Sequence, residues 1–206
     1  MVRAATIFLA GKANAARARD VDVRSLLKQY LQASEARDTL LIDELGLCQG
    51  DVRVDVAAVN GELSGYEIKS PSDTLARWPN QRRVYSRVVD RAWLVAPLKA
   101  IERADVPGWW GQIGVFDSDD KLALRVVRAS QRNPKPDPLS IARLLWRDEA
   151  IALLECAGTA RGVASKSRGV IWERIAETVE LDALRAAVRT ALKGRQARVA
   201  ALHRKR

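Results

Sequence analysis

Three charged side chains stand in segments whose other residues are typical of buried strands. Asp55 lies inside the apolar run 52–59, and Glu67 and Lys69 end the run 63–69. A charge in such a place is costly unless it is paired or binds a metal ion. Carboxylates suit a hard divalent cation, and a lysine beside them suits a phosphate. The residues therefore predict a metal-dependent site for phosphodiester chemistry.

The two strands must pair in one particular register for these groups to meet. Glu67 and Lys69 share a face because side chains alternate along a strand. A two-residue loop at 60–61 would place Asp55 opposite Tyr66, which leaves Glu67 on the wrong face.

The proposed chemistry therefore requires a different connection between the strands. Either the loop has three residues, Asn60-Gly61-Glu62, or a bulge at Gly65 shifts the register. A regular two-residue turn without a bulge would exclude the site.

The rest of the composition excludes several other function classes. The single histidine, His203, lies in a basic tail, which argues against Ser-His-Asp or Cys-His catalysis and against most zinc sites. No Gly-rich phosphate loop or dinucleotide fingerprint is present. Cys48 and Cys156 lack metal-type spacing, so we expect reduced core residues in a cytoplasmic protein. No apolar stretch reaches the roughly 20 residues of a membrane span, so no membrane partner is expected.

Positive charge is concentrated at the C-terminus. The chain carries a net charge of +10, and no acid follows Asp182. Eight cations lie in the last 24 residues, which leaves +2 for residues 1–182. A polyanionic partner, with nucleic acid the first choice, is the natural interpretation, and a solvated, frayed terminus is the alternative. The eight cations are Arg185, Arg189, Lys193, Arg195, Arg198, Arg204, Lys205 and Arg206.

The pattern along the chain predicts an α/β fold. We expect a poorly ordered segment 1–20, a core domain 21–130, a Pro-rich linker 131–138 and a helical C-terminal region 139–206 with a basic tail. The segment 40–42 is either a short strand or the end of a helix. The other predicted elements are a helix at 23–31, strands at 52–59, 63–69 and 92–96, a helix with Pro79 in its first turn and 81–90 as its body, a hairpin of 113–116 with 122–127, and helices at 139–156, 165–179 and 182–200.

The six tryptophans are expected to be core residues rather than platforms for base stacking. Trp109 and Trp110, beside a turn, are the two that could be exposed. The helical region around 154–175 faintly resembles SAP-like DNA-binding hairpins, and a helical cap packed on the sheet is the alternative.

The charged residues together resemble the central motif of the PD-(D/E)xK nuclease superfamily. Asp55 followed by Glu67-Ile68-Lys69 forms that motif, with Val54 where the superfamily name implies a proline. Glu44 precedes Asp55 where the superfamily places an additional acid. Asp51 competes with Asp55, which is preferred because it lies inside the apolar run.

A helix motif extends the resemblance. Gln81 and Tyr85 match the Q-x-x-x-Y pattern of the RecB-like branch and share one helix face. The segments 43–95, 108–116 and 132–149 also resemble a small bacterial and phage family within that superfamily. The resemblance implies a restriction-endonuclease-like α/β/α sandwich with a central mixed sheet.

The resemblance also implies roles for each residue. Asp55 and Glu67 would bind Mg²⁺ or Mn²⁺, with the Ile68 carbonyl and Glu44 as further ligands. Lys69 would orient the attacking water or stabilise the pentavalent phosphate. Gln81 and Tyr85 would position Lys69 or the nucleic acid, which we expect to be DNA.

Two other interpretations of these residues stay open. The chain could be a non-catalytic nucleic-acid-binding protein on a nuclease fold, or an interaction protein that uses the fold only as a scaffold. Glu67 and Lys69 would then be an ordinary ion pair. The oligomeric state is open, and a homodimer is one option.

Overall fold

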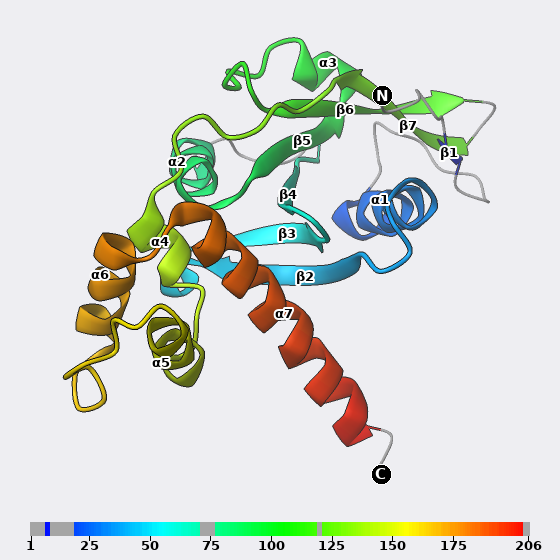
Figure 1. Cartoon of the computed structure of the whole chain (residues 1–206). Helices are drawn as coiled ribbons and strands as arrows, with labels where there is room; N and C mark the ends of the chain where they lie inside the picture. Colours follow the sequence, from blue (N-terminus) through cyan, green and yellow to red (C-terminus); the bar gives the residue numbers. More distant parts are fainter. Residues whose placement is uncertain (1–6, 9–18, 71–76, 119–120, 204–206) are drawn as a thin grey trace.

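A mixed sheet with helices on both faces forms the body of the protein (Figure 1). The computed structural model describes residues 7–8, 19–70, 77–118 and 121–203. The sheet has seven strands in the order β1-β7-β6-β5-β4-β3-β2. The predicted α/β fold with a C-terminal helical region is confirmed. Most of the predicted disordered segment 1–20 lies outside the described residues, but Ile7–Phe8 forms a strand and the first helix begins at Asp20.

The strands and helices follow the sequence pattern closely. Segment 40–42, left open by the sequence, belongs to a strand. The strands are β1 (Ile7–Phe8), β2 (Leu40–Leu47), β3 (Val52–Val59), β4 (Leu63–Ile68), β5 (Arg91–Pro97), β6 (Gly111–Ser118) and β7 (Lys121–Arg128), and the 3-10 turn η1 (Cys48–Gly50) joins β2 to β3. The helices are α1 (Asp20–Ser34), α2 (Trp78–Val88), α3 (Leu98–Ile101), α4 (Pro138–Ala142), α5 (Arg147–Cys156), α6 (Arg168–Thr178) and α7 (Leu181–His203).

Strand direction explains the layering. β2, β3 and β4 form an antiparallel meander, while β4, β5 and β6 run parallel and are joined through α2 and α3. Parallel neighbours need crossover helices, which cover the sheet and bury its strands on both faces. β5 accordingly places Leu94 in one core and Val95 in the other. One core packs against α2 and the C-terminal helices, and the opposite core packs against α1.

The β3–β4 loop has the three-residue length that the proposed site requires. Val59 pairs with Leu63 and Val56 with Tyr66, so residues 60–62 form the loop. The Asn60 side chain closes it by accepting a hydrogen bond from the Glu62 N–H at 3.0 Å. The pairing keeps one register throughout, and the alternative of a bulge at Gly65 is therefore wrong.

Side-chain alternation breaks in β2 and β3 at the same level of the sheet. Ile42 and Leu45 pack in the same core although they are three positions apart, and so do Val54 and Ala57. In a regular strand such residues face opposite sides. In β2 the break coincides with Glu44, whose backbone φ of 54° is unusual for a residue with a side chain. The sequence left a strand or a helix end open for the segment before Glu44, and the residue lies inside a distorted strand.

The helical C-terminal region shares the core of the sheet. The predicted helix 139–156 is wrong in its continuity, since it divides into α4 and α5. Both Leu144 and Leu145 are buried at the break, and the Glu149 carboxylate accepts from the N–H of Trp146 to begin α5. A second helix therefore begins at Arg147, and Glu149 completes its capping box.

The Pro-rich segment 131–138 is held against α2. The Asn133 side chain is buried and donates to the carbonyls of Ser86 and Val89, both at 2.9 Å. Asp137 pairs with Arg87 at 2.6 Å and also caps α4. The prolines end the β-rich half of the chain, while these polar contacts fix its position relative to the helical half.

Most of the basic tail is paired within the protein. Arg185 and Arg189 face Asp90, Lys193 pairs with Asp38 at 2.8 Å, and Arg195 and Arg198 face Glu149. The described cations after Asp182 therefore face acids from earlier parts of the chain, and a polyanionic partner for the tail stays a prediction. Residues 204–206 lie outside the described residues.

Candidate functional site

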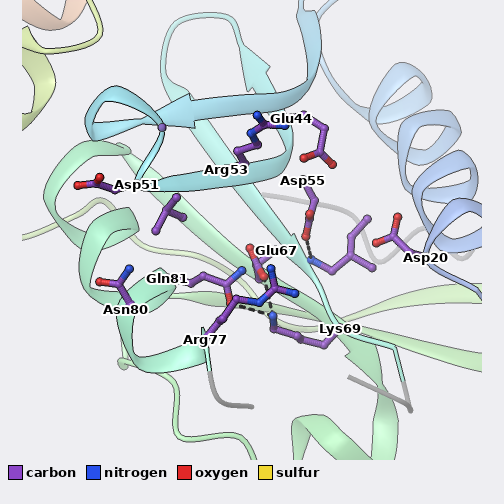
Figure 2. Close-up of a pocket in the computed structure, with 13 residues that line it drawn as sticks. Asp20, Glu44, Asp51, Arg53, Asp55, Glu67, Lys69, Arg77, Asn80 and Gln81 are labelled. Carbon is purple, nitrogen blue, oxygen red and sulfur yellow. Dashed lines mark hydrogen bonds and ion pairs between the residues drawn. The ribbon is translucent and has the colours of Figure 1, made fainter. Parts of the chain in front are cut away.

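A polar cavity of about 550 Å³ is lined by residues at the start of α1 and α2, at the start of β3 and at the end of β4. Figure 2 shows acidic and basic side chains that face into it from both helices and from the three strands of the meander. Its lining residues are Asp20, Glu44, Gly50, Asp51, Val52, Arg53, Asp55, Glu67, Ile68, Lys69, Arg77, Asn80 and Gln81. The structure therefore brings five of the six predicted site residues to one cavity, and the sixth, Tyr85, is buried behind it.

Asp55 and Glu67 lie side by side where β3 and β4 separate. The last paired residues are Val56 and Tyr66, and continuing that register places Asp55 opposite Glu67. Beyond that point a side chain takes the place of a backbone acceptor: the Asp55 carboxylate oxygen Oδ2 accepts a hydrogen bond from the N–H of Ile68 at 2.7 Å. Ile68 lines the cavity. A metal-binding role for its carbonyl stays a prediction.

Glu67 is almost fully buried yet carries a full set of polar neighbours. It is 1% exposed. Lys69 donates to its Oε1 at 2.7 Å, and the hydroxyl of Tyr85 donates to its Oε2 at 2.7 Å. A buried carboxylate is tolerated only with such partners. The predicted i, i+2 arrangement of Glu67 and Lys69 is therefore a direct contact on the α2 face of the sheet.

Helix α2 supplies the groups that hold the lysine and the glutamate. Gln81 accepts a hydrogen bond from Lys69 Nζ at 2.9 Å, and Tyr85, one turn further, reaches Glu67. The Lys69 ammonium also lies 5.9 Å from the ring centroid of Trp78. Tyr85 is completely buried, so it positions Glu67 and cannot itself contact a nucleic acid.

The proximity of the two carboxylates alters the protonation of Asp55. Burial, and next the negative charge of Glu67, raise the pKa of Asp55 to about 7. The hydrogen bond from Ile68 and the charge of Arg24 act in the opposite direction. Two carboxylates this close do not both ionise readily unless a cation joins them.

Glu44 lines the same cavity but is directed to an arginine. Its position in β2 is opposite Asp55, since Asp43 pairs with Val56 and Leu45 with Val54. Its Oε1 lies 2.7 Å from Nη1 of Arg24 on α1. The same guanidinium contacts Asp20 and Asp55, so one cation serves three acids.

A known protein family matches most of the chain. The family model described as "Bacteriophage P4 protein cII" matches residues 14–205. The chain belongs to the bacteriophage P4 protein cII family. No curated protein matches this cII-family chain. Among solved structures, the SPO1766 protein of unknown function from Silicibacter pomeroyi matches with a TM-score of 0.40 and 21% identity, over 53% of this chain and 69% of its own.

Three arginines that line the cavity of this cII-family chain, or pair with the acids that line it, were not identified from the sequence. Arg24 lies on α1, 31 residues before Asp55, and Arg53 and Arg77 line the cavity wall. No sequence motif marks Arg24, because its spacing from Asp20 is ordinary for a helix and it belongs to the polar face of α1. The competing acid Asp51 is exposed at the edge of the cavity and lies outside the Asp55–Glu67 pair.

The oxygen donors fit a magnesium ion held by two carboxylates. Across the described residues, no three or more His, Cys, Asp or Glu side chains form a group that could hold a metal ion. Glu44 is paired with Arg24. Mg²⁺ commonly takes only one or two protein carboxylates and completes its octahedron with water and phosphate oxygens. The raised pKa of Asp55 beside Glu67 shows a site where a bound cation would relieve repulsion. Asp55 and Glu67 are the residues that suit this role.

Other expectations of the sequence can be compared with the described residues. Cys48 and Cys156 are both free, but Cys156 is exposed and its assignment to the core is wrong. Trp110 is fully buried, which confirms the expectation that it is a core residue, whereas Trp146 is 58% exposed, contrary to that expectation. Within the described ranges, every helix is too short or too polar to cross a lipid bilayer.

Proposed function

We propose that this cII-family protein is a metal-dependent nuclease that hydrolyses phosphodiester bonds, with DNA as substrate, and that it belongs to the PD-(D/E)xK superfamily. The observation that supports this proposal is the contact set of Glu67. Its carboxylate lies beside Asp55 at the end of two strands and receives Lys69 on one oxygen and Tyr85 on the other. The restriction-endonuclease-like arrangement of the sheet is part of the same proposal.

Each residue has a role that follows from its place. Asp55 and Glu67 would hold Mg²⁺, which when bound would lower the pKa of a coordinated water and offset charge on the phosphate. The Lys69 ammonium would donate hydrogen bonds to a phosphate oxygen at the scissile bond, where negative charge increases during attack by water. Water would lose a proton to solvent and add its oxygen to phosphorus, while the P–O bond to the leaving sugar oxygen would break and that oxygen would take up a proton from solvent.

The remaining residues would maintain this geometry. Gln81 holds the Lys69 side chain, so that its ammonium stays at the cavity wall. Tyr85 fixes the Glu67 carboxylate from behind, and Arg53 and Arg77 give the cavity a positive rim for a polyanion. Arg24 would compensate Glu44 and Asp55 on the side opposite to Lys69.

One observation favours a second candidate, a non-catalytic nucleic-acid-binding protein on the same fold. Arg24 already neutralises Glu44 and approaches Asp55 at 3.5 Å. A site whose acids are compensated by an internal guanidinium can persist without a metal ion. The two candidates differ in whether a divalent cation binds and whether DNA is cut.

The test is cleavage of supercoiled plasmid and of labelled oligonucleotides with Mg²⁺ or Mn²⁺, against the same reactions in EDTA. We expect cleavage by the wild-type chain, its loss in Lys69→Ala and Asp55→Asn, and nearly unchanged DNA binding by Lys69→Ala. Lys121→Ala and Glu102→Gln are matched controls, since both residues are exposed and lie outside the cavity.

Two results would contradict these assignments. One, metal-dependent cleavage that persists unchanged in Lys69→Ala, would refute the catalytic role of Lys69. The other is a wild-type protein that neither cuts DNA nor binds Mn²⁺ by calorimetry, which together with DNA binding would establish the non-catalytic candidate.

A further inference from the structure

A second cavity lies on the other side of the η1 turn, between β2 and the C-terminal helices. Its volume is about 330 Å³, and three arginines and two tryptophans contribute to its wall. Gly50 lines both this cavity and the acidic one, so the two are separated only by the η1 turn. The full lining is Leu45, Gly46, Gln49, Gly50, Arg143, Leu144, Leu145, Trp146, Arg168, Trp172 and Arg195.

Two of the arginines have no acidic partner. Among the described residues, the Arg143 guanidinium makes no hydrogen bond or ion pair, and its buried Nε is without a partner. Arg168 is exposed, and within the part of the chain that the structure describes it has no ion-pair partner; its guanidinium lies 5.6 Å from the ring centroid of Trp172. This differs from the tail on α7, where the described cations face acids. A buried donor without a partner is uncommon and points to an anionic ligand.

An exposed aromatic ring stands beside these charges. Trp146 is 58% exposed although it lies next to the buried pair Leu144 and Leu145. The Arg195 guanidinium lies 4.3 Å from the ring centroid, and Glu149 fixes it by an Nε–Oε1 hydrogen bond of 2.9 Å. The indole is therefore held in place while much of its surface stays open. Aromatic rings beside cationic grooves are the usual means of binding unpaired bases.

We propose that this second cavity anchors a single-stranded segment of nucleic acid. Arg143 and Arg168 bind its phosphates, and an unpaired base stacks on Trp146. The segment continues past Gly50 into the acidic cavity, where Asp55 and Glu67 lie. That the bound strand is then cut in the acidic cavity rests on the nuclease proposal above, whereas binding of the strand to the second cavity does not. The arrangement makes a strand with an unpaired region, rather than an intact duplex, the preferred substrate.

Binding is measured on the full chain in EDTA, so that metal chemistry does not contribute. The probe is a fluorescein-labelled oligothymidine, with a duplex of equal length for comparison, read by fluorescence anisotropy over a range of salt. We expect the double variant Arg143→Gln/Arg168→Gln to bind the single strand at least about tenfold more weakly. Its plot of log K against log salt should be shallower by about 0.7 for each phosphate that the variant no longer neutralises.

A second variant separates stacking from charge. Trp146→Ala should weaken single-strand binding by about tenfold while leaving the salt slope unchanged, because a stacked base releases no counterions. Arg161→Gln is the matched control: this exposed arginine lies in the loop between α5 and α6, outside the cavity. Far-ultraviolet circular dichroism confirms that each variant is folded.

Each outcome decides one of the two proposals. Three results would overturn the anchoring site. The double variant could bind with the affinity of the wild type, the wild type could fail to bind the single strand, or the variant could lose more affinity for the duplex than for the single strand. Cleavage of a single-stranded oligonucleotide that survives in these variants with unchanged KM would overturn it too and leave the nuclease proposal standing. Weakened binding in a protein that never cuts DNA supports the anchoring site and removes the nuclease proposal.

Discussion

Arg24 and Asp55 are joined by two contacts from one guanidinium. Nη1 donates to the Asp55 carbonyl at 2.9 Å, and Nη2 lies 3.5 Å from the carboxylate oxygen Oδ1. The Arg24 side chain is 19% exposed, so this charge acts in a partly desolvated place. Helix α1 therefore contributes a cation to a site whose acids come from the sheet, and that cation competes with any divalent ion for the same oxygens.

Replacing Arg24 by Gln should raise the affinity for Mn²⁺. Removal of a nearby positive charge changes the interaction with a divalent ion by on the order of 1 kcal/mol, about fivefold in affinity. The same variant should lose about 1–3 kcal/mol of folding stability, because charged hydrogen bonds between α1 and the sheet disappear. Calorimetry and urea denaturation measure the two effects. A lower Mn²⁺ affinity would instead make Arg24 a supporting element of the metal site.

Metal binding should strengthen as the pH rises through 7. Asp55 must be deprotonated to bind a cation, and its pKa of about 7 leaves much of it protonated in mildly acidic solution. Calorimetric titration with Mn²⁺ at pH about 6 and about 8 should show higher affinity at the upper value, with proton release at the lower one. Equal affinities and no proton release would contradict this assignment of Asp55.

The same group should make the metal-free protein less stable as the pH rises from about 4 to about 7. In this window the folded chain keeps a proton on Asp55 that the unfolded chain, with the ordinary pKa of 3.8, has released. Raising the pH therefore favours unfolding. Asp55→Asn should flatten this dependence in urea titrations in EDTA, and a variant whose stability follows the wild-type curve would argue against the raised pKa.

Tyr85→Phe should weaken the site without removing any group that touches substrate. The change deletes the hydroxyl that bonds Glu67, and a buried hydrogen bond to a charged group contributes about 1.5–3 kcal/mol. We expect that loss in urea denaturation and a lower kcat in plasmid cleavage with little change in KM. Tyr66→Phe is the control, because Tyr66 is buried in the opposite core. Equal effects of the two substitutions would contradict a role for Tyr85 in positioning Glu67.

Arg185→Met should destabilise the protein by about 3 kcal/mol. Arg185 Nε lies 2.8 Å from Asp90 Oδ1 as an ion pair without hydrogen-bond geometry, and both side chains are below 10% exposed, at 8% and 5%. The substitution leaves the Asp90 carboxylate buried beside the N–H of Leu63 and the more distant Arg189. Arg198→Ala, which is 63% exposed, should change stability by less than about 0.5 kcal/mol. Similar small losses of folding stability in both variants would show that the Arg185–Asp90 ion pair does not stabilise the packing of α7.

Local sequence determined the elements and the central pair of the site. Apolar runs identified β3, β4 and β5, and Pro79 marked the start of α2. The proposed meeting of Asp55 with Glu67 required either a three-residue loop or a bulge, and the structure has the loop. These features depend on neighbours along the chain or across one short loop. Their periods and turn chemistry are therefore readable from the residues themselves.

Only the tertiary structure decided which charges meet. Arg24 reaches Asp55 across 31 positions and Lys193 reaches Asp38 across 155, so neither pairing leaves a local signal. The same packing directs Glu44 to an arginine and leaves Trp146 at the surface. Long charged side chains and single aromatic residues take their partners from whatever the fold places beside them, whereas periodicity records only which face of an element is apolar.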